Sequence, residues 1–230
     1  MIFDPPLFPG ILVRRYKRFL ADVTIAGRAQ TVHCANPGSM LGLAEPGSRI
    51  WLSDSKSATR RLPLSWELVE AGGTLVGINT GYANRLVQEG LAAGQIGELA
   101  GYGTIRREVA YGEGSRVDFL LEGASRPPCY LEVTSVTLKR GETAEFPDAV
   151  TARGTRHLAE LCAMRRAGAR AVMLFLVQRG DCSRLTFASD IDPAYARGIE
   201  EARGAGVELL AYGCRVAPTG IEVTGPLALS

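Results

Sequence analysis

Two acidic residues interrupt apolar runs in the middle of the chain. Asp118 lies within residues 115–121 and Glu132 within residues 129–134, and both segments alternate apolar and polar residues as strands do. If the two strands are hairpin neighbours, both carboxylates converge on one side of a sheet. A buried carboxylate is unfavourable unless it is paired or binds a metal, and oxygen ligands suit Mg²⁺ or Mn²⁺. The pair therefore predicts a divalent-cation site, with structural ion pairing as the alternative.

A cation held by such a pair suits phosphodiester hydrolysis, because it polarises a phosphoryl oxygen and lowers the pKa of a bound water. In nucleases of the PD-(D/E)XK type, a lysine two positions after the second acid orients that water. Thr134 occupies this position here, and a hydroxyl supplies no positive charge. Lys139 follows in a predicted polar loop and could reach the acids as a displaced lysine. Glu89, in the preceding predicted helix, is the candidate third acid, with a solvated helix residue as the alternative.

Basic residues gather near the N-terminus. Residues 1–82 hold nine Lys or Arg against six Asp or Glu, whereas residues 83–230 hold 17 against 18. Cations bind phosphates and tyrosine can stack on a base, so the pattern suits a nucleic-acid contact, while a charged strand edge is the alternative. The cluster consists of Arg14, Arg15, Tyr16, Lys17 and Arg18. A second candidate set for phosphate contacts comprises Lys139, Arg140, Arg153, Arg156 and His157.

Other functional classes lack their signatures. The chain has two histidines outside any HExxH frame and no GxSxG, Walker A or Rossmann GxGxxG motif, so no organic cofactor is expected. Its five cysteines include no CxxC pair, which favours reduced thiols in a cytoplasm. No apolar run approaches the roughly 20 residues of a membrane helix, and no signal peptide is visible. Membrane and secreted classes are therefore excluded, and we expect a cytoplasmic protein.

The elements that must position these residues fall into two groups. The 230 residues, 46% hydrophobic and 22% charged, suffice for one large or two small globular domains. Residues 1–82 show short strands between Pro- and Gly-containing turns, which predicts a small β-barrel of the OB type, with other small barrels as alternatives. Residues 83–230 follow the order helix, three strands, helix, strand, helix, strand, which predicts a mixed-sheet α/β domain. The helices are expected at residues 83–99, 150–166 and 193–203.

Several distinctive short sequence motifs occur along the chain. They are RYKRFLADV at 15–23, HCANPGSM at 33–40, WELV at 66–69, VGINT at 76–80, SRVDFL at 115–120 and FPDAVT at 146–151. Through them the chain resembles the sugar fermentation stimulation protein A (SfsA) family along nearly its whole length. The resemblance implies an OB-like domain, a second domain of the PD-(D/E)XK nuclease fold, DNA binding with little sequence preference, and a link to sugar-utilisation gene expression in bacteria. It also implies Asp118 and Glu132 as the two sheet acids and Glu89 as a helix acid.

The chain departs from the family pattern near the second acid. The family usually has Glu-Val-Lys where this chain has Glu132, Val133 and Thr134, and RGQKHL where this chain has RGTRHL at 153–158. Two hypotheses follow: a DNA-binding protein on a nuclease-like scaffold, or a Mg²⁺- or Mn²⁺-dependent nuclease in which Lys139 replaces the lost lysine. A regulator that binds a small ligand in the barrel is a third. The sequence assigns no oligomeric state.

Overall fold

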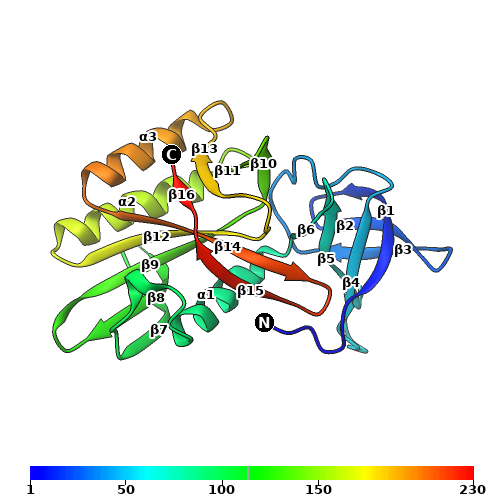
Figure 1. The fold of residues 1–230 in the computed structure, drawn as a ribbon, viewed down its shortest axis with the longest axis horizontal. Coiled ribbons are helices and arrows are strands. Elements are labelled where there is room, and N and C mark those ends of the chain that lie inside the picture. The colour runs from blue at the N-terminus through cyan, green and yellow to red at the C-terminus, as the bar shows by residue number, and fades with distance from the viewer. Residues whose placement is uncertain (113) are drawn as a thin grey trace.

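A computed structural model describes residues 1–112 and 114–230 of the chain. The chain forms an N-terminal barrel followed by an α/β domain, and the two lie side by side (Figure 1). This arrangement confirms the predicted fold class of an OB-like barrel followed by a mixed-sheet α/β domain. No helix within the described ranges is both long and apolar enough to cross a membrane.

The six strands of this domain pair in the order β3-β2-β1-β4-β5-β6. A parallel pairing of β3 with β5 closes β1 to β5 into a five-stranded barrel, and β6 pairs with β5 beyond the closure. The barrel interior is packed around the fully buried Trp66, with Val23, Val32 and Ile50 among its neighbours. The strands are β1 (Phe8–Tyr16), β2 (Leu20–Ile25), β3 (Arg28–Cys34), β4 (Arg49–Asp54), β5 (Leu64–Ala71) and β6 (Thr74–Gly77). Strand β3 was not predicted, because only Val32 and Cys34 in it are buried and its other residues are polar or small.

A six-stranded mixed sheet forms the centre of the second domain, in the order β15-β14-β12-β9-β8-β7. Strands β9, β12 and β14 are parallel, and the outer pairings are antiparallel. The strands are β7 (Thr104–Tyr111), β8 (Ser115–Gly123), β9 (Arg126–Val136), β12 (Arg170–Val177), β14 (Glu208–Ala217) and β15 (Gly220–Pro226). A smaller sheet contains β10 (Leu138–Arg140), β11 (Thr143–Phe146), β13 (Arg184–Phe187) and β16 (Ala228–Leu229).

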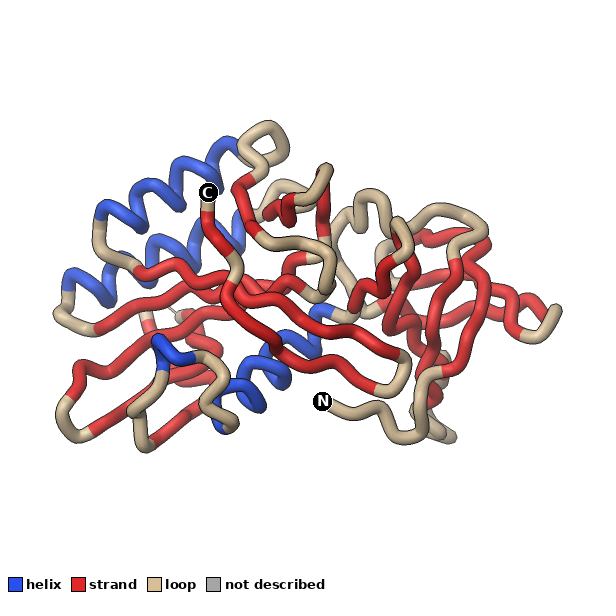
Figure 2. Tube along the Cα trace, in the orientation of Figure 1, coloured by secondary structure: helices blue, strands red, loops and turns tan. Residues whose placement is uncertain are grey.

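Helices cover both faces of the large sheet (Figure 2). Helix α1 (Ala83–Ala92) packs Leu86 and Val87 on one face. Helices α2 (Ala152–Arg166) and α3 (Pro193–Gly204) pack on the other. Short 3-10 turns precede and follow α1 as η1 (Thr80–Tyr82) and η2 (Gly97–Leu99). The helix predicted over 83–99 ends earlier because the chain turns at Gly94, whose φ is +69°.

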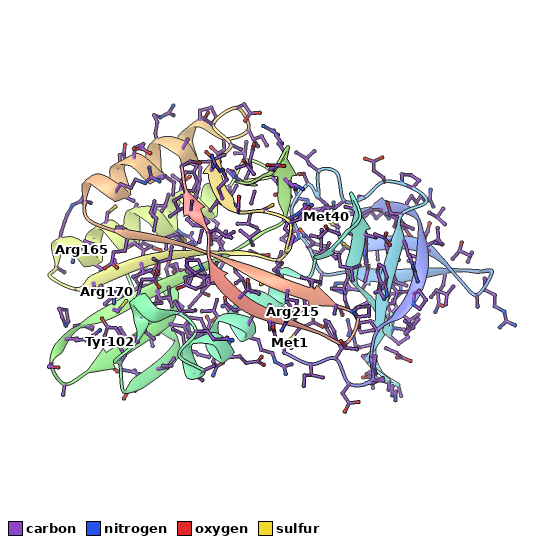
Figure 3. All side chains as sticks on the ribbon, in the orientation of Figure 1. Met1, Met40, Tyr102, Arg165, Arg170 and Arg215 are labelled. Atoms are coloured by element: carbon purple, nitrogen blue, oxygen red, sulfur yellow. The ribbon has the colours of Figure 1, made fainter. Side chains whose placement is uncertain are left out.

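The two domains share both hydrogen bonds and apolar core. The backbone N–H of Gly77 donates to the carbonyl of Gln178 at 2.8 Å. Trp51 and Leu68 of the barrel are buried in the hydrophobic core of the second domain. Met40 lies near the junction of the domains, where its backbone N–H donates to a carboxylate oxygen of Asp148 at 2.9 Å (Figure 3). The junction therefore holds the barrel in a defined place against the α/β domain.

Candidate functional site

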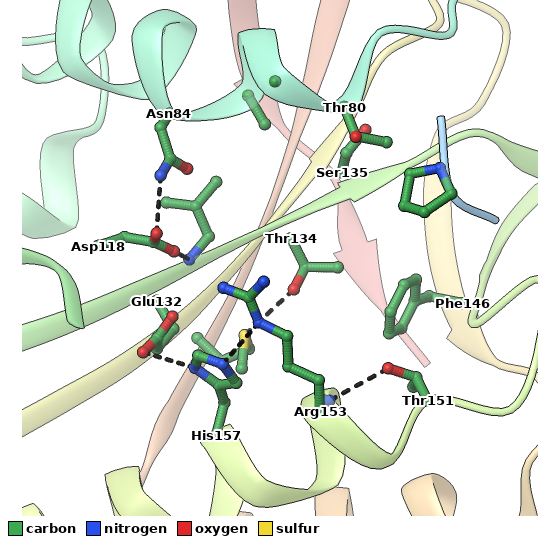
Figure 4. A pocket seen from close by; sticks show the side chains of 16 residues that line it. Thr80, Asn84, Asp118, Glu132, Thr134, Ser135, Phe146, Thr151, Arg153 and His157 are labelled. Atoms are coloured by element: carbon green, nitrogen blue, oxygen red, sulfur yellow. Dashed lines mark hydrogen bonds and ion pairs between the residues drawn. The ribbon is translucent and has the colours of Figure 1, made fainter. Parts of the chain in front are cut away.

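A cleft of about 300 Å³ opens where strands β8 and β9 meet the N-terminal ends of helices α1 and α2. Asp118, Glu132 and Thr134 line it from the sheet, Arg153 and His157 from α2, and Pro37 from the barrel (Figure 4). The two acids that the sequence singled out therefore share one cleft, and the barrel contributes to its wall. Alternation along the two strands predicted this convergence.

Asp118 is held in place by both of its carboxylate oxygens. The register of the β8–β9 pair places Phe119 opposite Leu131, and continuing it by one residue brings Asp118 opposite Glu132. Oδ1 of Asp118 accepts a hydrogen bond from the Asn84 side chain at 2.7 Å, and Oδ2 accepts one from the backbone N–H of Val133 at 2.8 Å. The N-terminal end of α1 thus orients this carboxylate toward the cleft.

Glu132 is a buried carboxylate with only 3% of its surface exposed. Its Oε1 accepts hydrogen bonds from the Tyr111 hydroxyl and from His157 Nδ1, the latter at 2.7 Å. Its Oε2 has no hydrogen-bond partner among the described residues. Burial raises the pKa of Glu132, and the negative charge of Asp118 raises it further, against the lowering effect of the bond from His157. Because Oε2 has no partner among the described residues, the Glu132 carboxylate keeps this oxygen available beside Asp118.

His157 connects Glu132 to a cationic side chain on the same helix. Nε of Arg153 donates to His157 Nε2 at 3.1 Å, so Nε2 is an acceptor and the ring proton lies on Nδ1, where it is donated to Glu132. Arg153 and His157 are four residues apart and therefore share a face of α2. The helix begins at Ala152 because the Thr151 hydroxyl accepts from the Gly154 N–H at 3.1 Å. Arg153, His157 and the buried Glu132 are therefore connected by consecutive hydrogen bonds.

Thr134 occupies the position at which the resemblance led us to expect a lysine. Its hydroxyl lies 3.7 Å from the Met173 sulfur and brings no positive charge to the cleft. No lysine of the described residues lines the cleft. Arg153 is the cationic side chain at this place.

The structure does not bring Glu89 or Lys139 to the acids, although both were candidate catalytic residues. Glu89 binds the N-terminal amino group of Met1 at 2.6 Å and Arg85 Nε at 3.0 Å. Lys139 lies in strand β10 rather than in a loop, and its Nζ contacts Asp181 Oδ2 at 2.6 Å. Burial alone would raise the pKa of Asp181, but hydrogen bonds from Arg179 and Lys139 outweigh it and lower that pKa. Both residues are engaged in ion pairs away from the cleft.

Many of the basic residues proposed for phosphate contacts have partners within the chain. Arg14 pairs with Asp22 at 2.8 Å and lies over the Tyr16 ring. Arg15 donates to the backbone carbonyls of Asn36 and Gly38 at 2.8 and 2.9 Å, which fixes the loop after β3. Arg140 pairs with Glu145 and Asp190. Arg14 and Arg140 are exposed but paired, so the exposed cations of the two candidate sets that form no ion pair with described residues are Lys17, Arg18, Arg153 and Arg156.

The donor atoms in the cleft fit a hard divalent cation that keeps much of its water. The described residues contain no group of three or more His, Cys, Asp or Glu side chains placed to hold a metal. Asp118 and Glu132 together supply two carboxylates, and Glu132 keeps Oε2 without a protein partner. Mg²⁺ is commonly bound by one or two carboxylates together with water and phosphate oxygens. The pair therefore fits such a cation and does not fit one that needs a complete protein cage.

Sequence reasoning missed the residues that hold the two acids. Asn84 is an ordinary polar residue at a helix start, and Tyr111 is an ordinary strand residue. Their roles depend on the packing of α1 against the sheet and on the pairing of β7 with β8, which no local pattern reports. Among the residues around the two acids, Arg153 and His157 did give a signal in the sequence, because residues four positions apart on a predicted helix share one face.

Comparison with known proteins agrees with the two-part architecture. The family model for the SfsA N-terminal OB domain matches residues 13–78, and that for the sugar fermentation stimulation protein RE domain matches residues 81–220. The chain belongs to the SfsA family. The predicted boundary between residues 82 and 83 lies close to the gap between these two matches.

Several SfsA-family proteins match the chain along its whole length. A sugar fermentation stimulation protein homolog of Paramagnetospirillum magneticum is 55% identical over 230 residues, covering 100% of this chain and 98% of the relative. One of Rhodospirillum centenum is 56% identical over 232 residues, covering 100% of both. A solved structure, described as Pyrococcus furiosus SfsA in complex with Ca²⁺, is 31% identical with a TM-score of 0.91, covering 100% of this chain and 98% of that one.

Proposed function

We propose that this SfsA-family protein binds DNA at the cleft between its domains, with little sequence preference and with Mg²⁺ or Mn²⁺ held by Asp118 and Glu132. The observation that carries the proposal is the meeting of these two acids in a cleft that Arg153 also lines. Carboxylates alone would repel DNA, so the arrangement makes sense where a cation and an arginine neutralise phosphate. DNA binding would also suit a role in the expression of sugar-utilisation genes, and the family's name refers to the stimulation of sugar fermentation.

The cation supports this proposal through the chemistry of its ligands. The related Pyrococcus furiosus structure is described as a complex with Ca²⁺, a hard cation that also prefers oxygen ligands. When bound, a divalent cation would relieve the repulsion between the two carboxylates, polarise a phosphoryl oxygen and lower the pKa of a bound water. The chain's own residues position the acids: Asn84 holds Asp118, while Tyr111 and His157 hold Glu132.

The test is the salt dependence of DNA binding, measured by fluorescence anisotropy with Ca²⁺ present. Each phosphate neutralised should make log K fall by about 0.7–0.9 per unit of log salt concentration. Arg153→Gln should reduce this slope by about one such increment. Arg203→Gln is the matched control, because Arg203 lies on α3 and pairs with Glu200 at 3.3 Å. An affinity that is flat between low and moderate salt would contradict DNA binding through phosphates.

Phosphodiester hydrolysis is a second candidate, and the free Oε2 of Glu132 beside Asp118 favours it. The lost lysine argues for slow hydrolysis, because Lys139 is bound to Asp181 and Thr134 is uncharged. Catalysis would then depend on the acids and their cation, without a lysine to orient the attacking water. Restoring the lysine is therefore an informative change.

Thr134→Lys should raise Mn²⁺-dependent cleavage of DNA or RNA by about 100-fold, the effect typical of one well-placed electrostatic group. The measurement compares wild type, Asp118→Asn, Thr134→Lys and the double variant on the same substrates. The double variant should lose the gain, because Asp118 holds the cation in both backgrounds. If Thr134→Lys and Asp118→Asn cleave at the same background rate, hydrolysis is excluded as the function of this site.

A further inference from the structure

A second cavity, of about 420 Å³, adjoins the cleft with the two acids. The two share the residues Pro37, Thr80, Ser135, Phe146, Thr151 and Arg153. Both domains line the second cavity, and Asp148 on its rim accepts a hydrogen bond from the Met40 N–H in the barrel at 2.9 Å. A strand bound at the acids therefore has a continuous path into this space.

One side of the second cavity is apolar and aromatic. Phe146 lines it, and the ring is supported from behind by Phe175 and Tyr195, with centroids 5.8 and 5.1 Å away. Pro147 and Val150 extend the same wall, and Val150 is 77% exposed. A supported aromatic ring beside proline and valine offers a flat organic ring a surface on which to stack.

The polar groups of this cavity do not suit a phosphate inside it. Glu145 and Asp148 line the cavity with negative charge, while Arg18 and Arg153 lie on its two sides. Thr137 lines the cavity as well; Arg179 donates to its backbone carbonyl at 2.9 Å, and its hydroxyl makes no hydrogen bond among the described residues. A hydroxyl in the wall of a cavity without a protein partner is available to a ligand that can hydrogen-bond. Carboxylates and hydroxyls pair with base edges, and the flanking arginines pair with phosphates.

We infer that the second cavity takes one unpaired nucleobase of a strand whose phosphate lies at the two acids. The inference rests on the proposed DNA-binding function and names its substrate class: single-stranded DNA, or a duplex that has lost pairing at one position. A base enclosed here cannot be paired, so a perfect duplex must first be opened. Opening the base pair costs free energy, and binding of a single strand does not carry this cost. The protein should therefore prefer single strands.

The test compares the affinities of the protein for three DNA ligands of equal length, with Ca²⁺ present. They are a single strand, the perfect duplex of that strand, and a fully abasic single strand that keeps every phosphate. The single strand should bind about tenfold more tightly than either of the others, as base stacking on an aromatic side chain allows. Equal affinity for all three would overturn the inference and leave DNA binding intact. Failure to bind any of them would overturn the proposed function together with the inference.

Variants locate the effect in the cavity. Thr137→Val, which removes the hydroxyl at constant shape, should lower the affinity for the single strand toward that of the abasic strand. Thr186→Val is the control, because Thr186 lies in β13 and its hydroxyl bonds the Ser230 carbonyl at 3.3 Å. Thermal melting of both variants verifies that they are folded. A preference for single strands that is the same in Thr137→Val and wild type would refute the assignment to this cavity.

Discussion

Glu132 illustrates how the site balances stability against function at the scale of a single residue. Its carboxylate is almost fully buried, and burial raises its pKa above the ordinary value near 4.5. The folded state therefore binds a proton more tightly than the unfolded state does. The stability that Glu132 contributes is complete below its ordinary pKa and is lost as pH rises through the raised folded-state pKa. Ionisation of Glu132 is therefore unfavourable for the fold, and a bound cation would compensate the charge.

Glu132→Gln should therefore stabilise the protein without added metal, by about 1 kcal/mol at neutral pH. The amide keeps the shape of the side chain and removes the charge. Denaturant unfolding at acidic and at neutral pH measures the effect. The stabilisation should vanish below the ordinary pKa of a glutamate, because both proteins are then uncharged at this position. A variant less stable than wild type at neutral pH would show that the charge stabilises the fold.

Strand β10 places Lys139 in a structural ion pair with Asp181 rather than in the cleft. Lys139→Met keeps the aliphatic stem but removes the contact with Asp181. We expect the free energy of unfolding to fall by about 0.5–1 kcal/mol, as for a partly exposed pair. Mn²⁺ affinity should stay at the wild-type value, since Lys139 does not line the cleft. Loss of Mn²⁺-dependent cleavage in this variant would restore Lys139 as the displaced lysine.

The sequence predicted those elements whose own residues carry a clear period. Alternation in β8 and β9 placed Asp118 and Glu132 on one side of the sheet, and the α2 periodicity placed Arg153 near His157. The short strands β10 and β11 escaped prediction because they are only three and four residues long. Strand β10 pairs with β11, and β11 is held by pairing with the distant β13. Strand β3 escaped because most of its residues are exposed or half-buried. Local sequence patterns indicate which residues are buried. Strands β3, β10 and β11 have few buried residues or are very short, and they are strands because they pair with other strands.

The docking of the two domains creates the site at the scale of the whole molecule. No pattern in the sequence predicted that Pro37 and Arg18 of the barrel would face α2, because the contacts are between segments more than a hundred residues apart. Trp51 and Leu68 are apolar side chains that connect the domains, because the barrel inserts them into the core of the second domain. The candidate site therefore depends on a shared core.

Trp51→Ala should lower the free energy of unfolding by about 3–5 kcal/mol, because a large side chain leaves the shared core. Trp66 is then the one tryptophan left in the sequence, and it lies fully buried inside the barrel. Its fluorescence and the far-UV circular dichroism signal should give different unfolding midpoints once the domains separate. Trp51→Phe is the control and should keep a single midpoint. Coincident midpoints in Trp51→Ala would show that the domains stay coupled without Trp51.

Calorimetric titration with Mn²⁺ tests most directly whether the two acids form a cation site. Wild type and Asp181→Asn should each bind one Mn²⁺ in the cleft, because Asp181 lies outside it and pairs with Arg179 and Lys139. Asp118→Asn and Glu132→Gln should each lose that binding, since two carboxylates are needed to hold the ion. Equal Mn²⁺ binding by wild type and both cleft variants would contradict the account.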